Sequence, residues 1–343
     1  MPFADIRGQA AALGFLARML RHGRVPGALL FAGPPHVGKR STALALAQAL
    51  NCERLVGGFS GTEMPDACGQ CPSCRQIAAG VHPDVQEVLP DGQFIKIDQV
   101  RQVIESLALI PLLARRRVVV LARAECLHLE SANALLKMLE EPPADSLLVL
   151  CASQPERLPD TIRSRCMPVH FAPLAQAVLR ALFAQPAGGK GAQAAALHGP
   201  ALDFAVRFAQ GRLRPVLRAK AGEWLAWRTD LVRALQELQQ GPSLTLEERL
   251  PLWSQPEGLD FVLEWLESWF RDLALLGAGA VPQALINADQ AEALQALLPG
   301  YPPARAARCQ AAVLATRQAL TLNANRSLAL EALWYSFKLG DAA

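Results

Sequence analysis

The sequence lacks long apolar runs and carries almost no excess charge of either sign. No stretch of about 18 apolar residues occurs, so no membrane-spanning helix is expected. The first residues, MPFADIRGQ, lack the apolar core of a signal peptide, which predicts a cytoplasmic protein. The formal net charge of +3 is too small to indicate nucleic-acid binding by itself.

What the chain does have is enough apolar material for a large core. Hydrophobic residues make up 51% of the sequence and charged residues 19%, which excludes a disordered chain. At 343 residues, the length allows two or three domains.

A phosphate-binding loop is the first recognisable motif. The apolar run 28–32 is typical of a buried strand, and an Ala- and Leu-rich helix over 42–50 follows the loop. Between them lies GPPHVGKR, close to the pattern G-x-x-x-x-G-K-[ST]. Gly33 and Gly38 would let backbone N–H groups face phosphate oxygens, and Lys39 would neutralise the outer phosphates.

The groups that would hold Mg²⁺ are missing from this motif. Arg40 replaces the metal-binding hydroxyl, and Ser41 lies about 100° further round the helix. Ala122 and Arg123 stand where an acidic pair should end another buried strand, and Glu125 comes three residues too late. We therefore predict no ATP hydrolysis, against the alternative of an ATPase with an unusual metal shell. Arg40 would either crowd the metal site or contact phosphate.

Four of the eight cysteines form a pattern typical of a metal site. Cys52, Cys68, Cys71 and Cys74 read C-x15-C-x2-C-x2-C, which in a reducing cytosol favours a metal over disulfides. Four thiolates suit a closed, structural Zn²⁺ site. The alternatives are a C-x2-C redox pair, or His82 in place of one thiolate. The other four are expected to be buried thiols: Cys126, Cys151, Cys166 and Cys309.

The order of the expected elements indicates an α/β core followed by helices. Strands alternating with helices predict a parallel, doubly wound sheet. The expected strands are 28–32, 84–89, 118–121 and 147–150. The expected helices are 5–21, 97–109 and one opening at Ser131 as its N-cap, while 55–66 reads as an irregular insertion. After Phe171-Ala172-Pro173 only helical patterns appear, first over 174–215 and then to about 340.

An arginine near the end of the mixed region could act on a neighbouring molecule. Arg165 lies in the stretch 158–166, which follows the last predicted strand and ends the mixed region. An arginine at a domain edge can enter a neighbour's nucleotide site and accelerate phosphoryl transfer by about 10³–10⁵. Taken alone, an exposed arginine is more often a solvated charge.

Taken together, these motifs resemble the AAA+ subunits of the bacterial sliding-clamp loader. They occur in the same order over residues 1–172: the loop 33–39, the four cysteines, IDQVR at 97–101, NALLKMLEEPP at 133–143 and Ser164-Arg165-Cys166. Near the C-terminus, LNAN at 322–325 and LALE at 328–331 are similar to the closing helix of these subunits.

The resemblance implies a three-domain architecture. An α/β AAA+ P-loop core would span 1–172 with a zinc module at about 52–80. A small helical lid would span 173–215, and an all-α collar that joins a five-subunit ring would span 216–343.

The departures at Arg40, Ala122 and Arg123 separate this chain from the motor subunits, gamma and tau, which keep a Thr and an Asp-Glu pair there. Leu202 also stands where the motors carry a nucleotide-sensing lid Arg. The resemblance thus implies the delta-prime branch, an accessory part of the DNA polymerase III holoenzyme without ATP turnover.

In that branch, the implied role belongs to Ser164 and Arg165. Arg165 would be offered in trans to ATP on a motor subunit, in a ring with gamma/tau and delta that loads the sliding clamp on primed DNA. Any nucleotide on Gly33, Gly38 and Lys39 would bind without a competent Mg²⁺ site. Two other readings stay open: an autonomous ATPase (a motor or a DNA-repair relative) and a zinc-binding adaptor without ring partners.

Overall fold

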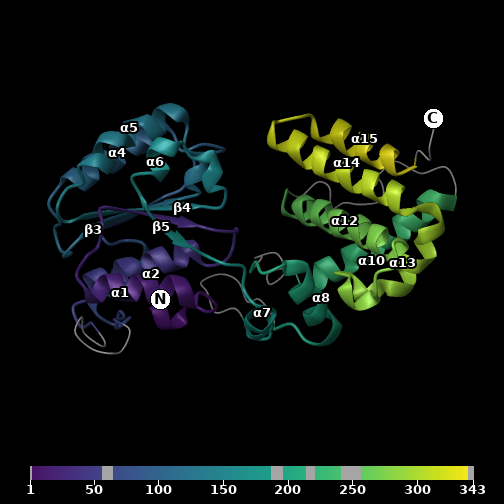
Figure 1. The fold of residues 1–343 in the computed structure, drawn as a ribbon, viewed down its shortest axis with the longest axis horizontal. Coiled ribbons are helices and arrows are strands. Elements are labelled where there is room, and N and C mark those ends of the chain that lie inside the picture. The colour runs from purple at the N-terminus through teal and green to yellow at the C-terminus, as the bar shows by residue number, and fades with distance from the viewer. Residues whose placement is uncertain (1, 56–64, 187–195, 214–220, 241–255, 339–343) are drawn as a thin grey trace. The chain divides into compact units, whose positions relative to one another are not determined.

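The computed structural model describes residues 2–55, 65–186, 196–213, 221–240 and 256–338 (Figure 1). The chain packs as two compact units: Met1–Val178 with Gly211–Leu213, and Leu179–Gln210 with Arg214–Ala343. The predicted lid at 173–215 has residues in both units, and its independence stays a prediction. The predicted insertion at 55–66 lies mostly outside the described residues.

The first unit is built on a parallel sheet of five strands, in the order β2-β3-β4-β1-β5. The strands are β1 (Ala28–Ala32), β2 (Val85–Val88), β3 (Arg117–Ala122), β4 (Ser146–Ala152) and β5 (Met167–His170). The predicted parallel α/β core is confirmed, and the arrangement fits an AAA+ fold. Strand β5 was not predicted: Pro168 weakens its strand pattern, and an edge strand tolerates a proline.

Helices cover both faces of this sheet because successive strand residues point to opposite sides. Leu29 and Phe31 pack toward α1 (Ala10–Arg21) and α2 (Lys39–Asn51). Leu30 and Ala32 pack toward α4 (Ile97–Ala108), α5 (Leu129–Glu140) and the short α6 (Asp160–Arg163). Figure 1 shows these two helical layers on either side of the sheet.

Two predicted helix starts are wrong, each for a long-range reason. The helix expected from residue 5 begins at Ala10, because Gln9 instead donates through Nε2 to the carbonyls of Val37 and Ala172. Ser131 is no N-cap: α5 begins at Leu129, and the buried Ser131 hydroxyl donates to the carbonyl of Ile95 at 3.0 Å.

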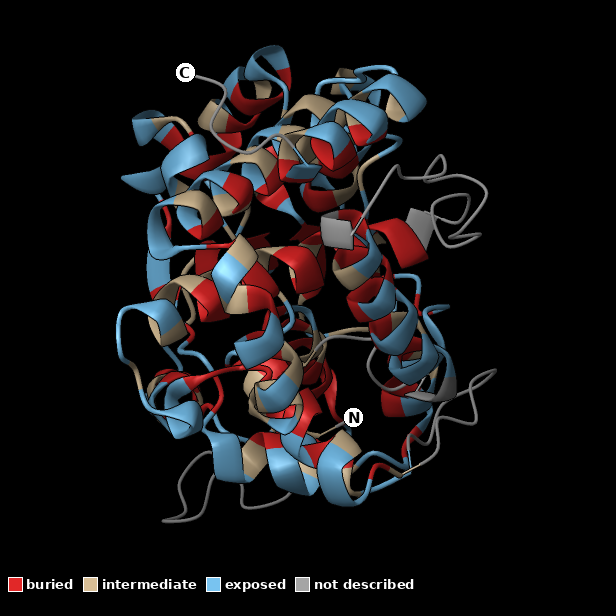
Figure 2. Cartoon of the chain, turned by 90° about the vertical axis from the view of Figure 1, so that its right-hand side faces the viewer, coloured by how far each residue is buried: buried red, intermediate tan, exposed pale blue. Residues whose placement is uncertain are grey.

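The described part of the second unit consists of helices and turns. After α7 (Gln176–Phe183), which runs out of the first unit, come α8 (Gly199–Ala209), α10 (Ala221–Gln240), α12 (Pro256–Gly277), α13 (Ala291–Leu297), α14 (Pro303–Thr321) and α15 (Arg326–Lys338). Figure 2 shows helices that are buried along one side and exposed along the other. No described helix is both long and apolar enough to cross a membrane.

Buried tryptophans and one polar network hold this unit together. Trp224, Trp265 and Trp269 are fully buried. The Trp265 indole N–H donates to the Asn287 side-chain oxygen at 3.0 Å. Asn287 in turn donates through its backbone N–H and its amide to Asp272, at 2.7 and 2.9 Å, so these buried polar groups are paired.

Candidate functional site

The loop after β1 keeps the backbone shape of a phosphate-binding loop. Gly33 has φ +151°, and a Cβ there would lie 2.2 Å from the carbonyl oxygen of Phe171, so no side chain fits. Gly38 has φ +102° and precedes α2, whose first residue is Lys39. The loop therefore ends at a helix N-terminus, where backbone N–H groups favour an anion.

Lys39 is held by the loop itself. Its Nζ donates to the carbonyls of Gly33 and Pro34, both at 2.6 Å, and to Ser153 Oγ at 3.2 Å. Burial lowers the pKa of Lys39, and the nearby Cys151 and Glu125 act in the opposite direction. These three contacts use the hydrogen-bonding capacity of the ammonium group.

A cavity of about 860 Å³ opens beside Lys39. The residues that line it from the end of β3 include no acidic pair. Ala122 and Arg123 line it where the carboxylates were missing from the sequence. Glu125 also lines it, because Arg123 adopts φ +57° and a short turn over Ala124–Cys126 folds back. Glu125 Oε2 is buried and accepts no hydrogen bond from the described residues. Sequence spacing had placed Glu125 too far along the chain to reach this site.

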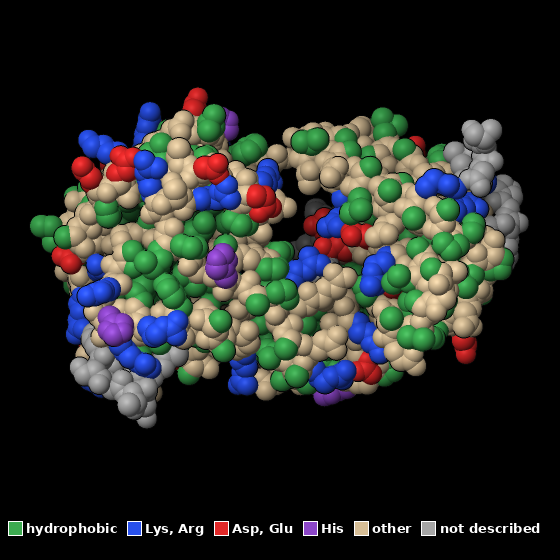
Figure 3. Space-filling model, viewed as in Figure 1, with side chains coloured by type: hydrophobic (Ala, Val, Ile, Leu, Met, Phe, Trp, Pro, Cys, Tyr) green, Lys and Arg blue, Asp and Glu red, His purple; other side chains and the backbone are tan. Residues whose placement is uncertain are grey.

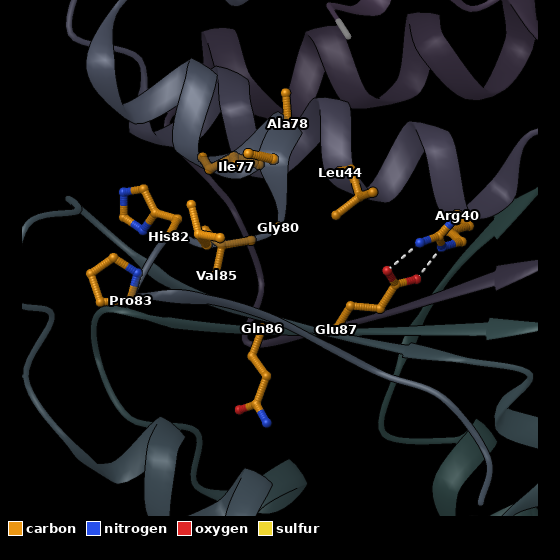
Figure 4. A pocket seen from close by; sticks show the side chains of 12 residues that line it. Arg40, Leu44, Ile77, Ala78, Gly80, His82, Pro83, Val85, Gln86 and Glu87 are labelled. Atoms are coloured by element: carbon orange, nitrogen blue, oxygen red, sulfur yellow. Dashed lines mark hydrogen bonds and ion pairs between the residues drawn. The ribbon is translucent and has the colours of Figure 1, made fainter. Parts of the chain in front are cut away.

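Arg40 lines the cavity beside Lys39, and its guanidinium is paired with a carboxylate. Its Nε and Nη2 both donate to the Glu87 carboxylate on β2 (Figure 4). This hydrogen bonding raises the pKa of Arg40. The pair lines a second cavity of about 630 Å³ between α2, α3 (Pro72–Ala79) and β2. Arg40 thus joins the P-loop helix to the edge strand of the sheet.

The four predicted metal-binding cysteines come together in the first unit. The Sγ atoms of Cys52, Cys68, Cys71 and Cys74 all lie within 4.8 Å of one another. Backbone N–H groups donate to three of them: Cys68 N to Cys52 Sγ (3.3 Å), Cys71 N to Cys68 Sγ (3.3 Å) and Cys74 N to Cys71 Sγ (3.4 Å). Such bonds stabilise thiolates, the form that binds metal.

The chemistry of this cluster fits a metal ion such as zinc. Backbone N–H groups of Gln70 and Cys71 lower the pKa of Cys68 to about 6, while burial raises the pKa of Cys52 and Cys74. Zinc–sulfur bonds of about 2.3 Å place tetrahedral sulfurs about 3.8 Å apart, within the span of the cluster. His82 does not take a ligand's place: its Nε2 contacts Ser73 Oγ at 3.3 Å, and its Nδ1 accepts from the N–H of Asp84.

Arg165 is exposed on a short, well-anchored segment. Ile162 and Cys166, on either side of it, are buried, and burial raises the pKa of Cys166 to about 12. Ser164 is the C-cap residue that follows α6, and it is exposed. Arg165 donates through Nε (2.9 Å) and Nη2 (2.5 Å) to Oε1 of Glu140, which is the last residue of α5.

Arg165 and the P-loop lie at opposite ends of the parallel strands: Arg165 lies where β5 begins, and the P-loop lies where β1 ends. Arg165 precedes β5, whose Met167 is in register with Leu29 near the start of β1. The P-loop instead follows Ala32, at the other end of β1. The five residues of β1 place its two ends about 13 Å apart. Arg165 is therefore remote from the P-loop of its own chain.

Leu202, which the resemblance aligns with the motor subunits' lid arginine, is buried in α8 of the second unit. Its apolar side chain has no group that could contact phosphate.

Two family models match the chain, one in each unit. Residues 8–175 match the model described as DNA polymerase III, delta subunit. Residues 222–338 match the model described as DNA polymerase III, delta subunit, C terminal.

Three curated relatives each match less than half of the chain. It is 41% identical over 142 residues to the DNA polymerase III subunit delta′ of Pseudomonas aeruginosa, covering 41% of this chain and 41% of that protein. It is 36% identical over 166 residues to subunit delta′ of Bacillus subtilis, covering 48% of each. It is 38% identical over 169 residues to subunit tau of Salmonella typhimurium, covering 49% of this chain and 25% of tau. The alignments thus span less than half of each relative's length.

Proposed function

Since the chain belongs to the delta-subunit family of DNA polymerase III, as a clamp-loader subunit of the delta-prime type, we propose that it hydrolyses no ATP itself. It instead serves the ATP site of a neighbouring motor subunit.

The P-loop region supports the absence of turnover. Hydrolysis needs a hydroxyl and a carboxylate that hold Mg²⁺ and a group that orients water. Arg40 is paired with Glu87, and β3 ends in Ala122. Glu125 enters the cavity from a turn rather than from the strand end, and Lys39 binds its own loop. Nucleotide binding here would therefore proceed without a competent magnesium shell.

The position of Arg165 carries the proposal. Arg165 is exposed at the end of the strands opposite to its own P-loop, too far away to reach a nucleotide bound there. It would therefore act on a phosphoryl group that is bound to another chain. Its guanidinium would stabilise the charge that develops during phosphoryl transfer on the adjacent motor subunit. Ser164 would shape the turn that presents it.

In the assembled loader, this chain would be the stationary member of a five-subunit ring with gamma/tau and delta. It would consist of an AAA+ core (1–172), a lid (173–215) and a collar (216–343). The collar would join the chain to the ring. ATP turnover on the motors would then open the sliding clamp and place it on primed DNA in the cytoplasm.

We also propose that the cysteine cluster binds one structural Zn²⁺ through Cys52, Cys68, Cys71 and Cys74. Four thiolates leave no open coordination position, so the metal would stabilise the module and take no part in phosphoryl transfer.

The proposal is tested by Arg165→Ala in a loader reconstituted from purified subunits. Turnover at the adjacent motor site should fall by about 10³-fold or more because the transition state loses a positive charge. Arg163→Ala is the matched control, since Arg163 is a neighbouring arginine that pairs with Asp160, three residues away. Unchanged ATPase and clamp loading in Arg165→Ala would remove the trans role.

The alternative is an ATP-hydrolysing motor subunit, which the 38% identity to tau favours. Steady-state hydrolysis by the chain alone, with Mg²⁺ and primed DNA, separates the two. We expect no turnover above background. Clear turnover that Lys39→Ala abolishes would establish the motor function instead.

A further inference from the structure

We infer that Glu140 is a positioning residue for Arg165: it holds the guanidinium in the orientation that a neighbouring phosphate would meet. The inference rests on the proposed trans role of Arg165. It adds a second residue of this chain, on a different helix, to the machinery that serves the neighbour's ATP.

The hydrogen bonds to Arg165 leave part of its guanidinium unused. A guanidinium carries five N–H groups. Arg165 Nε and Nη2 donate to the same oxygen of Glu140, Nη1 donates to the Thr161 carbonyl at 3.0 Å, and a longer 3.5 Å contact joins Nη1 to Ser164 Oγ. Apart from that longer contact, one N–H on each terminal nitrogen remains. Two such groups are what bidentate phosphate recognition needs.

Both partners stand on anchored backbone. Glu140 is the last residue of α5, and Pro142, two residues on, packs against Gly27, where a Cβ would lie 2.3 Å from Pro142 Cβ. Arg165 is fixed by the buried Ile162 and Cys166 on either side. The ion pair thus connects two rigid points and limits the rotamers of a long side chain, which reduces the entropy lost when phosphate binds.

Glu140 occupies a position that helix energetics disfavour. A carboxylate at a helix C-terminus faces the negative end of the helix dipole. Its side chain is 51% exposed and that of Arg165 is 35% exposed, so the pair contributes little to folding. In the region of α4 to α6, acidic and basic side chains lie side by side on the surface (Figure 3). The Arg165–Glu140 pair is the one among them that contains the proposed trans arginine.

The test is Glu140→Gln in the reconstituted loader. The amide keeps an acceptor oxygen but loses the charge, so we expect kcat at the adjacent motor site to fall about tenfold, with KM for ATP unchanged. Glu141→Gln is the matched control, since Glu141 is exposed, follows Glu140 directly and makes no contact with Arg165 among the described residues. The melting temperature should be the same in all three proteins.

A double-mutant cycle separates this inference from the proposed function. In an Arg165→Ala background, Glu140→Gln should cause no further loss. If Arg165→Ala slows turnover but Glu140→Gln equals wild type or is faster, the positioning role is overturned and the trans role stands. If Arg165→Ala has no effect, both fail.

Discussion

Asp84 shows how one buried side chain can shape a whole loop. Its carboxylate accepts the backbone N–H groups of Leu112, Leu113 and Ala114 at 2.9, 2.7 and 2.9 Å. Arg117 Nη2 donates to the same group at 2.7 Å. Burial acts to raise the pKa of Asp84, but these donors outweigh it and lower the pKa. The loop is thereby held with Ile110 87% exposed.

Asp84→Asn should destabilise the first unit by about 3 kcal/mol at neutral pH, because Arg117 is left buried without its counter-charge. Since the folded pKa is depressed, the contribution is complete above the unfolded value of about 3.9 and is lost as pH falls through the folded value. Urea unfolding of both proteins at pH 7 and at acid pH measures this. Asp91→Asn, at an exposed pair with Lys96, is the control and should change little. A difference between wild type and Asp84→Asn that persisted undiminished in acid would contradict this account.

At the scale of elements, the cysteine module joins two helices. Cys52 follows the last residue of α2, and Cys71 is the N-cap of α3, whose sulfur accepts the N–H of Cys74. A metal bound to the cluster would connect the end of one helix to the start of the next. Closing such a loop reduces the entropy of the unfolded chain, so the metal would stabilise the module.

Purified protein should contain about one zinc per chain, measured by elemental analysis. Cys71→Ser should lose most of the metal and lower the melting temperature by about 5 °C, as should prolonged chelation. Cys309→Ser removes a buried thiol of the second unit and should retain the zinc. An absence of metal, with all four cluster cysteines alkylated in the native protein, would refute the zinc site.

At the scale of the whole molecule, the last two helices present apolar side chains to solvent. Leu328 and Tyr335 are 65% and 59% exposed and lie seven residues apart, on one face of α15. Leu314 and Leu322, on and just after α14, are also exposed. Exposed apolar side chains suit a protein interface, and the proposed ring contact would cover them.

Leu328→Asp combined with Tyr335→Asp should weaken ring assembly about tenfold or more, because charges replace apolar contacts at an interface. Analytical ultracentrifugation with the motor and delta subunits measures it, and the melting temperature of the isolated chain should not change. Leu225→Asp alters an exposed leucine on α10 and serves as the control. Assembly equal to wild type in the double variant would exclude this face from the ring.

The local sequence pattern was enough to predict those features that depend on residues close together in the chain. The apolar runs at 28–32, 118–121 and 147–150 form strands because they are buried on both faces of the sheet. The cysteine spacing identified all four members of the cluster, and the glycines identified the P-loop. Motif order led to the family that the comparisons bear out.

Tertiary structure alone decided which distant residues meet. Periodicity could not reveal β5, which exists as a strand by pairing with β1, nor that Ser131 would donate to Ile95 from within a helix. The partners of Arg40 and Arg165 are 47 and 25 residues away in the chain, so no local rule could name Glu87 or Glu140. Sequence thus determined the elements and the chemical groups, since these depend on spacing of a few residues. The fold determined their partners, since contact between remote residues depends on how the sheet and helices pack.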